Sequence, residues 1–346
     1  MTRARWGRPR HSRRRVDRAG KTLSAPSPNI FEYNKALSVL GNWRASHSFP
    51  LNTIQMNLRQ KAGTVDSDPL VAQRLKRVSS TIAKLELYPH ISLSRMQDIG
   101  GCRAVVTGLE EVQALVRTFL ESRHRHILHK QQDYIESPRD TGYRSVHLVY
   151  KYRSERNTLY NTLRIEVQIR SRLQHAWATA VETVGAFLGE PLKSGKGPPD
   201  WLRFFAVVSS AFAMEEGTTP VPGTPHGDDL VAEVRQRAGD LRVADKLEAY
   251  GVALKTTPHI DRPDAHYYLL SVDFDGKNLE IVSYRQGELA RASRDYLRLE
   301  AKYRGRPERQ TLLVGAESMS ALRQAYPSYF LDTRLFLQHL RELTDE

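Results

Sequence analysis

The chain has 346 residues, of which 40% are hydrophobic, and it carries a formal net charge of +13 with a sequence pI near 9.8. No run of about 18 apolar residues predicts a membrane-spanning helix, and the length suffices for one large domain or two smaller ones. Without such a run we expect no membrane partner, and because the single cysteine, Cys102, excludes an internal disulfide, we expect a reducing, cytoplasmic setting. The charge favours polyanionic partners, either nucleotides or nucleic acid.

The chain begins with a basic arm. Between Arg3 and Lys21 there are nine basic residues and one acid, Asp17. Such a charge run is typical of a solvated tail. We therefore expect residues 1–28 to be a disordered arm, which can still hold phosphates without sequence specificity.

Helices and strands are mixed between residues 29 and 187. Helix-like apolar spacing covers Asn29–Gly63 and Pro69–Tyr88. Further helices are predicted at 110–123 and 172–187, and strands at 103–107, 142–153 and 163–170. Because no regular strand–helix–strand repeat occurs, we expect an α+β fold in which helices flank a mixed β-sheet.

Two stretches rich in proline and glycine, 190–200 and 220–227, predict loops. A charged helix at 228–250 is expected within a connector, 220–260, followed by a small C-terminal α/β domain at 261–346. That domain is predicted to open with a hairpin formed by 267–274 and 279–284, with Lys277 near its turn. Helices at 287–301, 319–325 and 333–343 and a strand at 311–314 complete it.

The segment Arg164–Arg170 is the most informative. Alternate residues of a strand face opposite sides, so Arg164, Glu166, Gln168 and Arg170 share one face. A carboxylate between two arginines suits a divalent ion together with phosphates, although self-paired charges on a solvated face would give the same pattern. The intervening Ile165, Val167 and Ile169 belong to the core.

The segment before it predicts a second polar face. Tyr143, Ser145 and His147 alternate along one strand, where a ring, a hydroxyl and an imidazole can stack a base and bond its sugar or phosphates. A single sheet histidine would more often have only a structural partner. Arg139, in the preceding loop, can present a cation to phosphate.

A basic helix face is expected in 74–84, where Lys76, Ser80 and Lys84 recur every four residues. Asp98 precedes a glycine pair that leads into the next strand, and it is either a cap or turn residue or a ligand for a hard cation. Gly100–Gly101 is not a P-loop, because the required spacing to a lysine is missing.

These motifs, in this order and spacing, resemble the RelA/SpoT-like alarmone synthetase domain over roughly residues 51–187, within a predicted synthetase domain at 29–219. The resemblance implies a nucleotidyltransferase-like sheet and a Mg²⁺-dependent pyrophosphokinase that moves pyrophosphate from ATP to a ribose 3′-hydroxyl. It implies that Asp98 and Glu166 hold Mg²⁺ and that Glu166 is the candidate base.

The same resemblance assigns the nucleotide contacts. Arg74 and Arg103 would sandwich adenine, and Lys76, Ser80 and Lys84 would form the rest of the ATP site. The implied acceptor contacts are Arg139, Tyr143, His147, Gln168 and Arg170. Where many relatives have lysine this chain has Gln132, and the family's acid–histidine pair after the helix tryptophan is absent, which puts a role for Glu182 in doubt.

The acceptor stays open. The basic arm, the overall charge and Gln132 favour the toxic branch of the family, with the 3′-terminal adenosine of tRNA as acceptor. GDP or GTP, as in an ordinary alarmone synthetase, or an adenine nucleotide is the alternative. A catalytically inactive RNA-binding module would be expected to lose Asp98 or Glu166, and both are present.

Two tyrosines near the C-terminus give a second clue. Tyr326 and Tyr329 are three residues apart, and Pro327 favours a turn or helix start there. They are either packing residues of a small domain, which could serve oligomerisation, or an inhibitory motif. The region resembles the pseudo-zinc-finger antitoxin domain of fused toxin–antitoxin synthetases of the CapRel type, which implies tyrosines covering the adenine site until a phage protein engages the domain.

Overall fold

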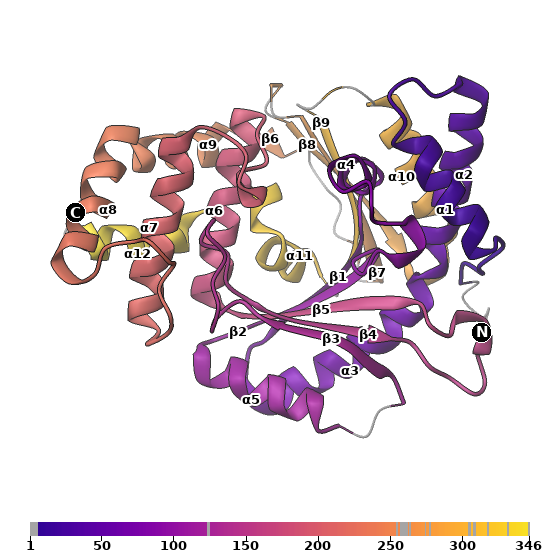
Figure 1. The fold of residues 1–346 in the computed structure, drawn as a ribbon, viewed down its shortest axis with the longest axis horizontal. Coiled ribbons are helices and arrows are strands. Elements are labelled where there is room, and N and C mark those ends of the chain that lie inside the picture. The colour runs from indigo at the N-terminus through magenta and orange to yellow at the C-terminus, as the bar shows by residue number, and fades with distance from the viewer. Residues whose placement is uncertain are drawn as a thin grey trace.

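The computed structural model describes residues 6–122, 125–253, 255–256, 262, 264–273, 275–276, 278–303, 306, 309–316, 318–330 and 332–344. Within these ranges one sheet of nine strands runs through the molecule in the order β3-β4-β5-β2-β1-β9-β7-β8-β6 (Figure 1). The strands are β1 (Leu70–Leu75), β2 (Gly100–Val106), β3 (Ile127–Asp133), β4 (Val146–Lys151), β5 (Arg164–Ser171), β6 (Lys255–Thr256), β7 (Ala265–Asp273), β8 (Asn278–Arg285) and β9 (Arg309–Gly315).

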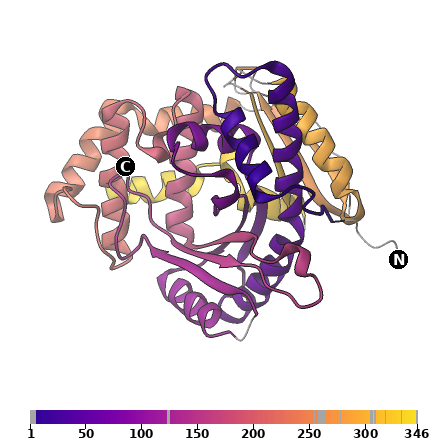
Figure 2. The same ribbon diagram turned by 45° about the vertical axis from the view of Figure 1, so that its right-hand side comes forward.

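Helices cover both faces of this sheet (Figures 1 and 2). They are α1 (Arg13–Leu23), α2 (Ile30–Ser46), α3 (Ser48–Val65), α4 (Val78–Leu87), α5 (Leu109–Leu120), α6 (Arg172–Leu188), α7 (Pro199–Glu215), α8 (Gly227–Leu241), α9 (Val243–Ala253), α10 (Leu289–Lys302), α11 (Met319–Ala325) and α12 (Arg334–Thr344). The pairs β2–β5 and β6–β8 are parallel and the others antiparallel, which confirms the expected α+β fold with a mixed sheet. No helix in the described ranges has the length and apolar character needed to cross a membrane.

One face of the synthetase-like half of the sheet is apolar. Ile165, Val167 and Ile169 of β5 are fully buried in a cluster with side chains of α3 and α5, as the alternation predicted. Figure 1 shows these two helices together below the sheet, while α4, α6 and α11 lie on its other side. The polar residues of β5 therefore face that other side.

The C-terminal strands extend the same sheet. β9 pairs with β1 at only two positions, Gln73↔Gly315 and Arg74↔Val314, and β7 and β8 follow as the predicted hairpin. The divisions at 219/220 and 260/261 stay predictions. Arg123, Phe274 and Lys277, which belonged to a predicted helix and hairpin, lie outside the described residues.

The expected disorder of the basic arm is wrong for residues 13–23. α1 runs from Arg13 to Leu23 and buries Val16, Ala19 and Leu23, which lie along one stripe of the helix. Its acid, Asp17, accepts hydrogen bonds from the backbone N–H of Ser94, at 2.8 Å, and from its hydroxyl, at 3.0 Å. The arginines occupy the remaining faces, so the charge run belongs to an amphipathic helix; residues 1–5 lie outside the described ranges.

Two helix predictions are also corrected. The span Pro69–Tyr88 is not one helix, because Leu70–Leu75 is a central strand bonded on both edges, to β2 and β9, before α4 begins. Whether such a short apolar run forms a strand or a helix depends on pairing with strands from distant parts of the chain. The helix expected at 228–250 is broken at Arg242, which has a left-handed φ of 49°.

Candidate active site

The strand register gathers the predicted site residues on one sheet face. Arg103 of β2 lies opposite Gln168 of β5, which lies opposite His147 of β4, and Glu166 lies opposite Gly101. Paired residues of neighbouring strands point to the same side. Arg74 joins this face from β1, because its partner there is also Gly101.

Asp98 lies just before β2 and is held by two lysines. Lys76 Nζ is 2.7 Å from Asp98 Oδ2, and Lys84 Nζ is 3.1 Å from Oδ1. Burial alone would raise the pKa of Asp98, but the charges of Lys76 and Lys84 outweigh it and hold the pKa well below its usual value. The carboxylate is thus ionised and available to a cation.

Lys76, Ser80 and Lys84 were predicted to share one face of a helix, and this is wrong for Lys76. Lys76 lies in the loop between β1 and α4, and its backbone N–H donates to the Ile99 carbonyl at 2.9 Å. Ser80 lies in the first turn of α4, where its hydroxyl accepts from Arg77 Nε at 3.2 Å. The two lysines still meet, because both bond Asp98.

Glu166 forms a second polar cluster. Gln168 Nε2 donates to Glu166 Oε2 at 2.8 Å, and His147 Nδ1 lies 3.3 Å from Oε1. Burial favours the neutral acid, but the hydrogen bond and charge of His147 lower the pKa of Glu166 overall. The charge of Asp98 opposes this shift, so the two carboxylates are near enough to interact.

This donor set fits Mg²⁺. The ion commonly takes one or two protein carboxylates and completes its octahedron with water and substrate phosphates. Asp98 supplies one ionised carboxylate, bonded by Lys76 and Lys84, and Glu166 supplies a second one that the charge of Asp98 reaches. No group of three or more His, Cys, Asp or Glu side chains suited to a metal occurs in the described part of the chain, so an ion here would depend on the phosphates as well.

An aromatic cluster lies beyond Glu166. Tyr143 precedes β4 rather than lying within it, yet its hydroxyl lies 2.8 Å from His147 Nε2. Burial and the neighbouring cations have opposite effects on Tyr143: burial raises its pKa, while the charges of His147, Arg170 and Lys193 lower it to about 7. Arg139 stacks 4.5 Å from the centre of the Tyr134 ring and bonds its hydroxyl, so it borders the same cluster from outside.

Arg170 lies between the two predicted nucleotide subsites. Its side chain is fully buried, and Nη2 donates to Gln168 Oε1 at 3.2 Å. Burial and the charge of Arg103 lower its pKa to about 10. Nε of Arg170 and Nε of Arg103 are buried and have no hydrogen-bond partner among the described residues, which suits them to a ligand. Arg164, at the far end of β5, instead bonds the Arg95 carbonyl.

The two C-terminal tyrosines lie on this face as well. Arg103 Nη1 donates to the Ala325 carbonyl at 3.3 Å, and its guanidinium lies 5.9 Å from the centre of the Tyr326 ring. Tyr326 and Tyr329 are 6% and 9% exposed, so both are almost covered. Burial lowers the pKa of Arg74, but the nearby Tyr329, Tyr326 and Glu182 raise it overall, which places the pair beside both arginines.

Sequence reasoning doubted Glu182 and missed Lys193. Glu182 Oε1 pairs with Lys193 Nζ at 2.9 Å, and Oε2 accepts from the Ser328 hydroxyl at 3.0 Å. Lys193 also lies 4.9 Å from the centre of the Tyr143 ring. The sequence offered little signal, because Lys193 lies in a stretch rich in proline and glycine and Ser328 is 146 residues from Glu182.

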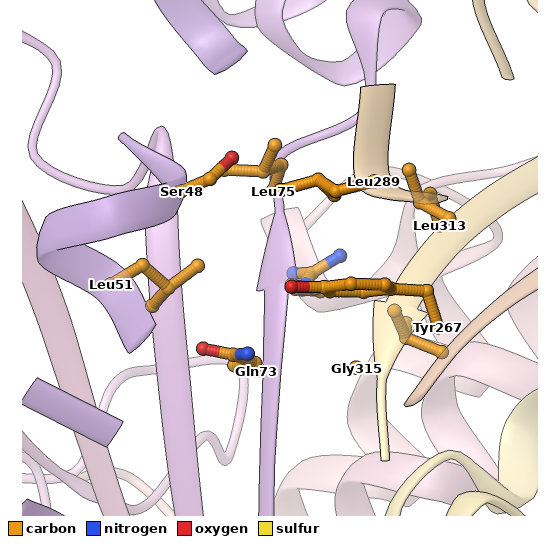
Figure 3. Close-up of a pocket in the computed structure, with 10 residues that line it drawn as sticks. Ser48, Leu51, Gln73, Leu75, Tyr267, Leu289, Leu313 and Gly315 are labelled. Atoms are coloured by element: carbon orange, nitrogen blue, oxygen red, sulfur yellow. The ribbon is translucent and has the colours of Figure 1, made fainter. Parts of the chain in front are cut away.

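A pocket opens beside Arg74, where β1 and β9 separate after their two paired positions (Figure 3). It is lined by Ser48, Leu51, Gln73, Arg74, Leu75, Tyr267, Leu289, Leu313, Val314 and Gly315. Ser48 Oγ, Gln73 Oε1 and Tyr267 Oη are buried and find no hydrogen-bond partner within the described residues. Such atoms normally bond ordered water, so the pocket marks a loosely packed junction of the sheet.

A comparison with known protein families matches the part of the chain that forms this site. Residues 73–184 match the model of a region found in RelA / SpoT proteins. The RelA/SpoT region runs from β1 into α6 and so holds every predicted site residue except Tyr326 and Tyr329.

Curated relatives agree with this match. The chain is 32% identical over 118 residues to GTP pyrophosphokinase YjbM of Bacillus subtilis, covering 33% of this chain and 56% of the relative. It is 27% identical over 115 residues to GTP pyrophosphokinase YwaC of the same organism, covering 33% and 52%. The chain therefore spans about half the length of these curated relatives.

Among solved structures, small alarmone synthetase 1 of Bacillus subtilis bound to its product pppGpp superposes with a TM-score of 0.43 and 24% identity, covering 50% of this chain and 90% of that chain. Small alarmone synthetase 2 of Bacillus subtilis gives a TM-score of 0.44 and 19% identity, covering 51% and 93%.

Proposed function

We propose that this chain is a Mg²⁺-dependent pyrophosphokinase that transfers pyrophosphate from ATP to a ribose 3′-hydroxyl. The observation that carries the proposal is the convergence of Asp98, Lys76 and Lys84 with Glu166 on one sheet face, inside the RelA/SpoT region. Two carboxylates with two ammonium groups suit a metal-bound triphosphate.

In this proposal Arg74 and Arg103 hold adenine between them. They occupy diagonal positions of the neighbouring strands β1 and β2. Residues in such positions are about 7–8 Å apart on the backbone, which leaves room for one planar ring between the two guanidinium groups. Lys76, Ser80 and Lys84 bind the triphosphate. Mg²⁺, held by Asp98 and Glu166, would neutralise charge that develops on the phosphate oxygens.

The reaction needs no protein nucleophile. The acceptor's 3′-oxygen forms a bond to the β-phosphorus of ATP, the bond from that phosphorus to the α,β-bridging oxygen breaks, and AMP leaves. Glu166 takes the proton of the hydroxyl, for which its lowered pKa keeps it ionised. Tyr143 stacks the acceptor base, and His147, Gln168, Arg170 and Arg139 hold its sugar and phosphates.

The preferred acceptor is the 3′-terminal adenosine of tRNA, which would make the protein a toxin that blocks translation. The net charge of +13 and the arginines of α1 support a polyanionic acceptor larger than a nucleotide. The second candidate is GDP or GTP, favoured by the names of both curated relatives, GTP pyrophosphokinases.

We further propose that the C-terminal region keeps the enzyme inactive. The contact of Tyr326 with Arg103 and the position of both tyrosines beside Arg74 support this, because a phenol ring there takes the space of adenine. Release by a phage protein that binds the C-terminal region is the regulatory step that the family resemblance suggests.

The test uses the full chain with Tyr326→Ala and Tyr329→Ala. Label from γ-labelled ATP is followed into bulk tRNA, GDP, GTP and AMP, offered in parallel. We expect faster transfer than in the wild type, and into tRNA. Label found only in guanosine nucleotides would select the second candidate, and equal rates for the double variant and the wild type would rule out the inhibitory role of the tyrosines.

A further inference from the structure

The loop between β1 and α4 carries Lys76 and is bonded by three distant parts of the chain. The Lys76 N–H donates to the Ile99 carbonyl, next to Asp98, at 2.9 Å. Its carbonyl accepts from Arg44 Nε of α2 at 2.6 Å. Two residues later, the N–H of Val78 donates to the hydroxyl of Tyr296 in α10 at 2.9 Å. The backbone around Lys76 is thus tied on both sides.

Arg44 and Tyr296 act as one buried unit. Arg44 is 4% exposed and Tyr296 is 1% exposed, and the guanidinium lies 4.5 Å from the centre of the phenol ring. Both views of the fold place α10 beside α2, the helix that carries Arg44 (Figures 1 and 2). A stacked guanidinium and phenol with one hydrogen bond each to the same loop form a rigid support for it.

The C-terminal region adds two further bonds to this loop. Arg77 Nη1 donates to Gln310 Oε1 of β9 at 2.8 Å, and the N–H of Ser79 reaches Glu300 of α10 at 3.4 Å. The residue that precedes α4, Arg77, offers no side-chain cap. The first two N–H groups of α4, those of Val78 and Ser79, therefore take their acceptors from α10.

We infer that Tyr296, together with Arg44, positions the Lys76–Val78 backbone for the triphosphate, so that the C-terminal region builds part of the ATP site that its tyrosines cover. The inference rests on the proposed function, in which Lys76 meets the phosphates. Lys76 reaches Asp98 only if its backbone stays at the end of β1, and the bonds from Ile99, Arg44 and Tyr296 fix it there.

The C-terminal region therefore has two separate effects on the ATP site. Removing the rings of Tyr326 and Tyr329 opens the adenine site, whereas removing the hydroxyl of Tyr296, which bonds the loop directly, weakens the hold on the phosphates. Deleting everything after residue 255 would do both and would also strip β9 from β1. Point variants of the full chain are therefore the informative ones.

The test compares Tyr296→Phe with Tyr284→Phe, each added to the Tyr326→Ala, Tyr329→Ala chain. Tyr284 is a matched control: it is buried in the same region, and its hydroxyl bonds Asp295, at 3.0 Å, rather than the loop. We expect Tyr296→Phe to raise the KM for ATP about tenfold and to change kcat less than twofold, because one buried hydrogen bond is removed. Arg44→Lys, which keeps the charge without the planar stack, should act in the same direction.

Amide hydrogen exchange in the otherwise wild-type chain gives a second readout that does not depend on activity. Tyr296→Phe should speed exchange at residues 78–81 about tenfold and leave β5 unchanged, while Tyr284→Phe should change neither. If no variant transfers pyrophosphate to any acceptor, the proposed function fails, and this exchange result still decides whether Tyr296 holds the loop. Equal acceleration in α4 and β5, or a Tyr296→Phe variant indistinguishable from Tyr284→Phe in KM and exchange, would overturn the inference.

Discussion

At the scale of single residues, the two carboxylates differ in their partners. Asp98 is bonded by two ammonium groups, whereas Glu166 is bonded by an amide and an imidazole. The lysines can turn to phosphate oxygens when a metal takes their place on Asp98. Glu166 contacts His147, whose other ring nitrogen contacts Tyr143, so it lies on the side that the proposal gives to the acceptor, where a base for the 3′-hydroxyl is needed.

Replacing Glu166 with Gln tests its assigned role. The amide keeps the shape of the side chain but accepts no proton and binds Mg²⁺ poorly, so we expect transfer to fall at least about 100-fold. The rate of label transfer is measured beside a thermal unfolding curve, in which the midpoint should move by only a few degrees. An enzyme that keeps its full rate would remove Glu166 from the mechanism.

Asp98 should make stability depend on pH. Its pKa is depressed in the folded state, so its contribution is present above its ordinary value of 3.8 and is lost as the pH falls through the folded pKa. We expect Asp98→Asn to lower the free energy of unfolding by roughly 1–3 kcal/mol at pH 7, between the values for exposed and buried pairs. The difference from the wild type should shrink below about pH 4.

Urea unfolding at pH 7, 5 and 3 measures this, with Asp68→Asn as control. Asp68 pairs with Arg172 on the surface, where its side chain is 76% exposed, so its replacement should cost little. A difference for Asp98→Asn that stays constant down to pH 3 would contradict the assigned ion pairs.

At the scale of elements, sequence periodicity predicted the strands and turns that a local pattern determines. It missed the elements that depend on partners from distant parts of the chain. The alternation in β5 was confirmed, and so was the hairpin of β7 and β8, because a half-buried strand and a short turn carry their own signals. β1 was missed because both of its neighbours come from elsewhere in the chain. α1 was missed because the nine cations of the arm, five of them on this helix, masked a narrow apolar stripe.

The same contrast holds in the site. The family resemblance grouped Asp98, Glu166 and the lysines, and the contacts of Lys76 and Lys84 with Asp98 are consistent with that grouping. The Glu182–Lys193–Ser328 contacts join three separate segments and have no common motif. No local pattern can predict such contacts, because they depend on how α6 meets the C-terminal region.

Packing of α1 gives a prediction at this scale. Leu23 is 2% exposed, so Leu23→Ala should lower the free energy of unfolding by about 2–4 kcal/mol through reduced burial and a residual cavity. Arg14→Ala, on the exposed side of the same helix, should change it by less than about 0.5 kcal/mol. Chemical denaturation compares the two variants. Equally small changes in the free energy of unfolding would show that α1 does not pack against the rest of the protein.

At the scale of the whole molecule, the net charge of +13 should make tRNA binding strongly dependent on salt. Arg14, Arg15 and Arg18 are exposed on α1 and are the candidates for phosphate binding outside the site. Replacing all three with Gln should reduce the slope of log affinity against log salt by about 0.7–0.9 for each phosphate that these arginines neutralise. Binding titrations between 50 and 200 mM salt measure the slope; an unchanged slope would show that α1 does not touch tRNA.

The two proposals together give the C-terminal region of the molecule two opposing functions. β9 and α10 support the loop of Lys76, while α11 and the tyrosines after it cover the arginines on the same face. A partner that pulled the C-terminal region away entirely would remove both. We therefore expect activation to displace the tyrosines and leave α10 in place.

The central claim is transfer of an intact pyrophosphate, and the fate of the three phosphates of ATP tests it most directly. The Tyr326→Ala, Tyr329→Ala chain is incubated with Mg²⁺, tRNA and a guanosine nucleotide, using ATP labelled at the α- or the γ-phosphate in parallel reactions. The account predicts that γ-label appears on the acceptor, that α-label appears in AMP in equal amount, and that both products vanish in Glu166→Gln. α-Label on the acceptor with release of pyrophosphate, release of ADP, or no product at all would contradict it.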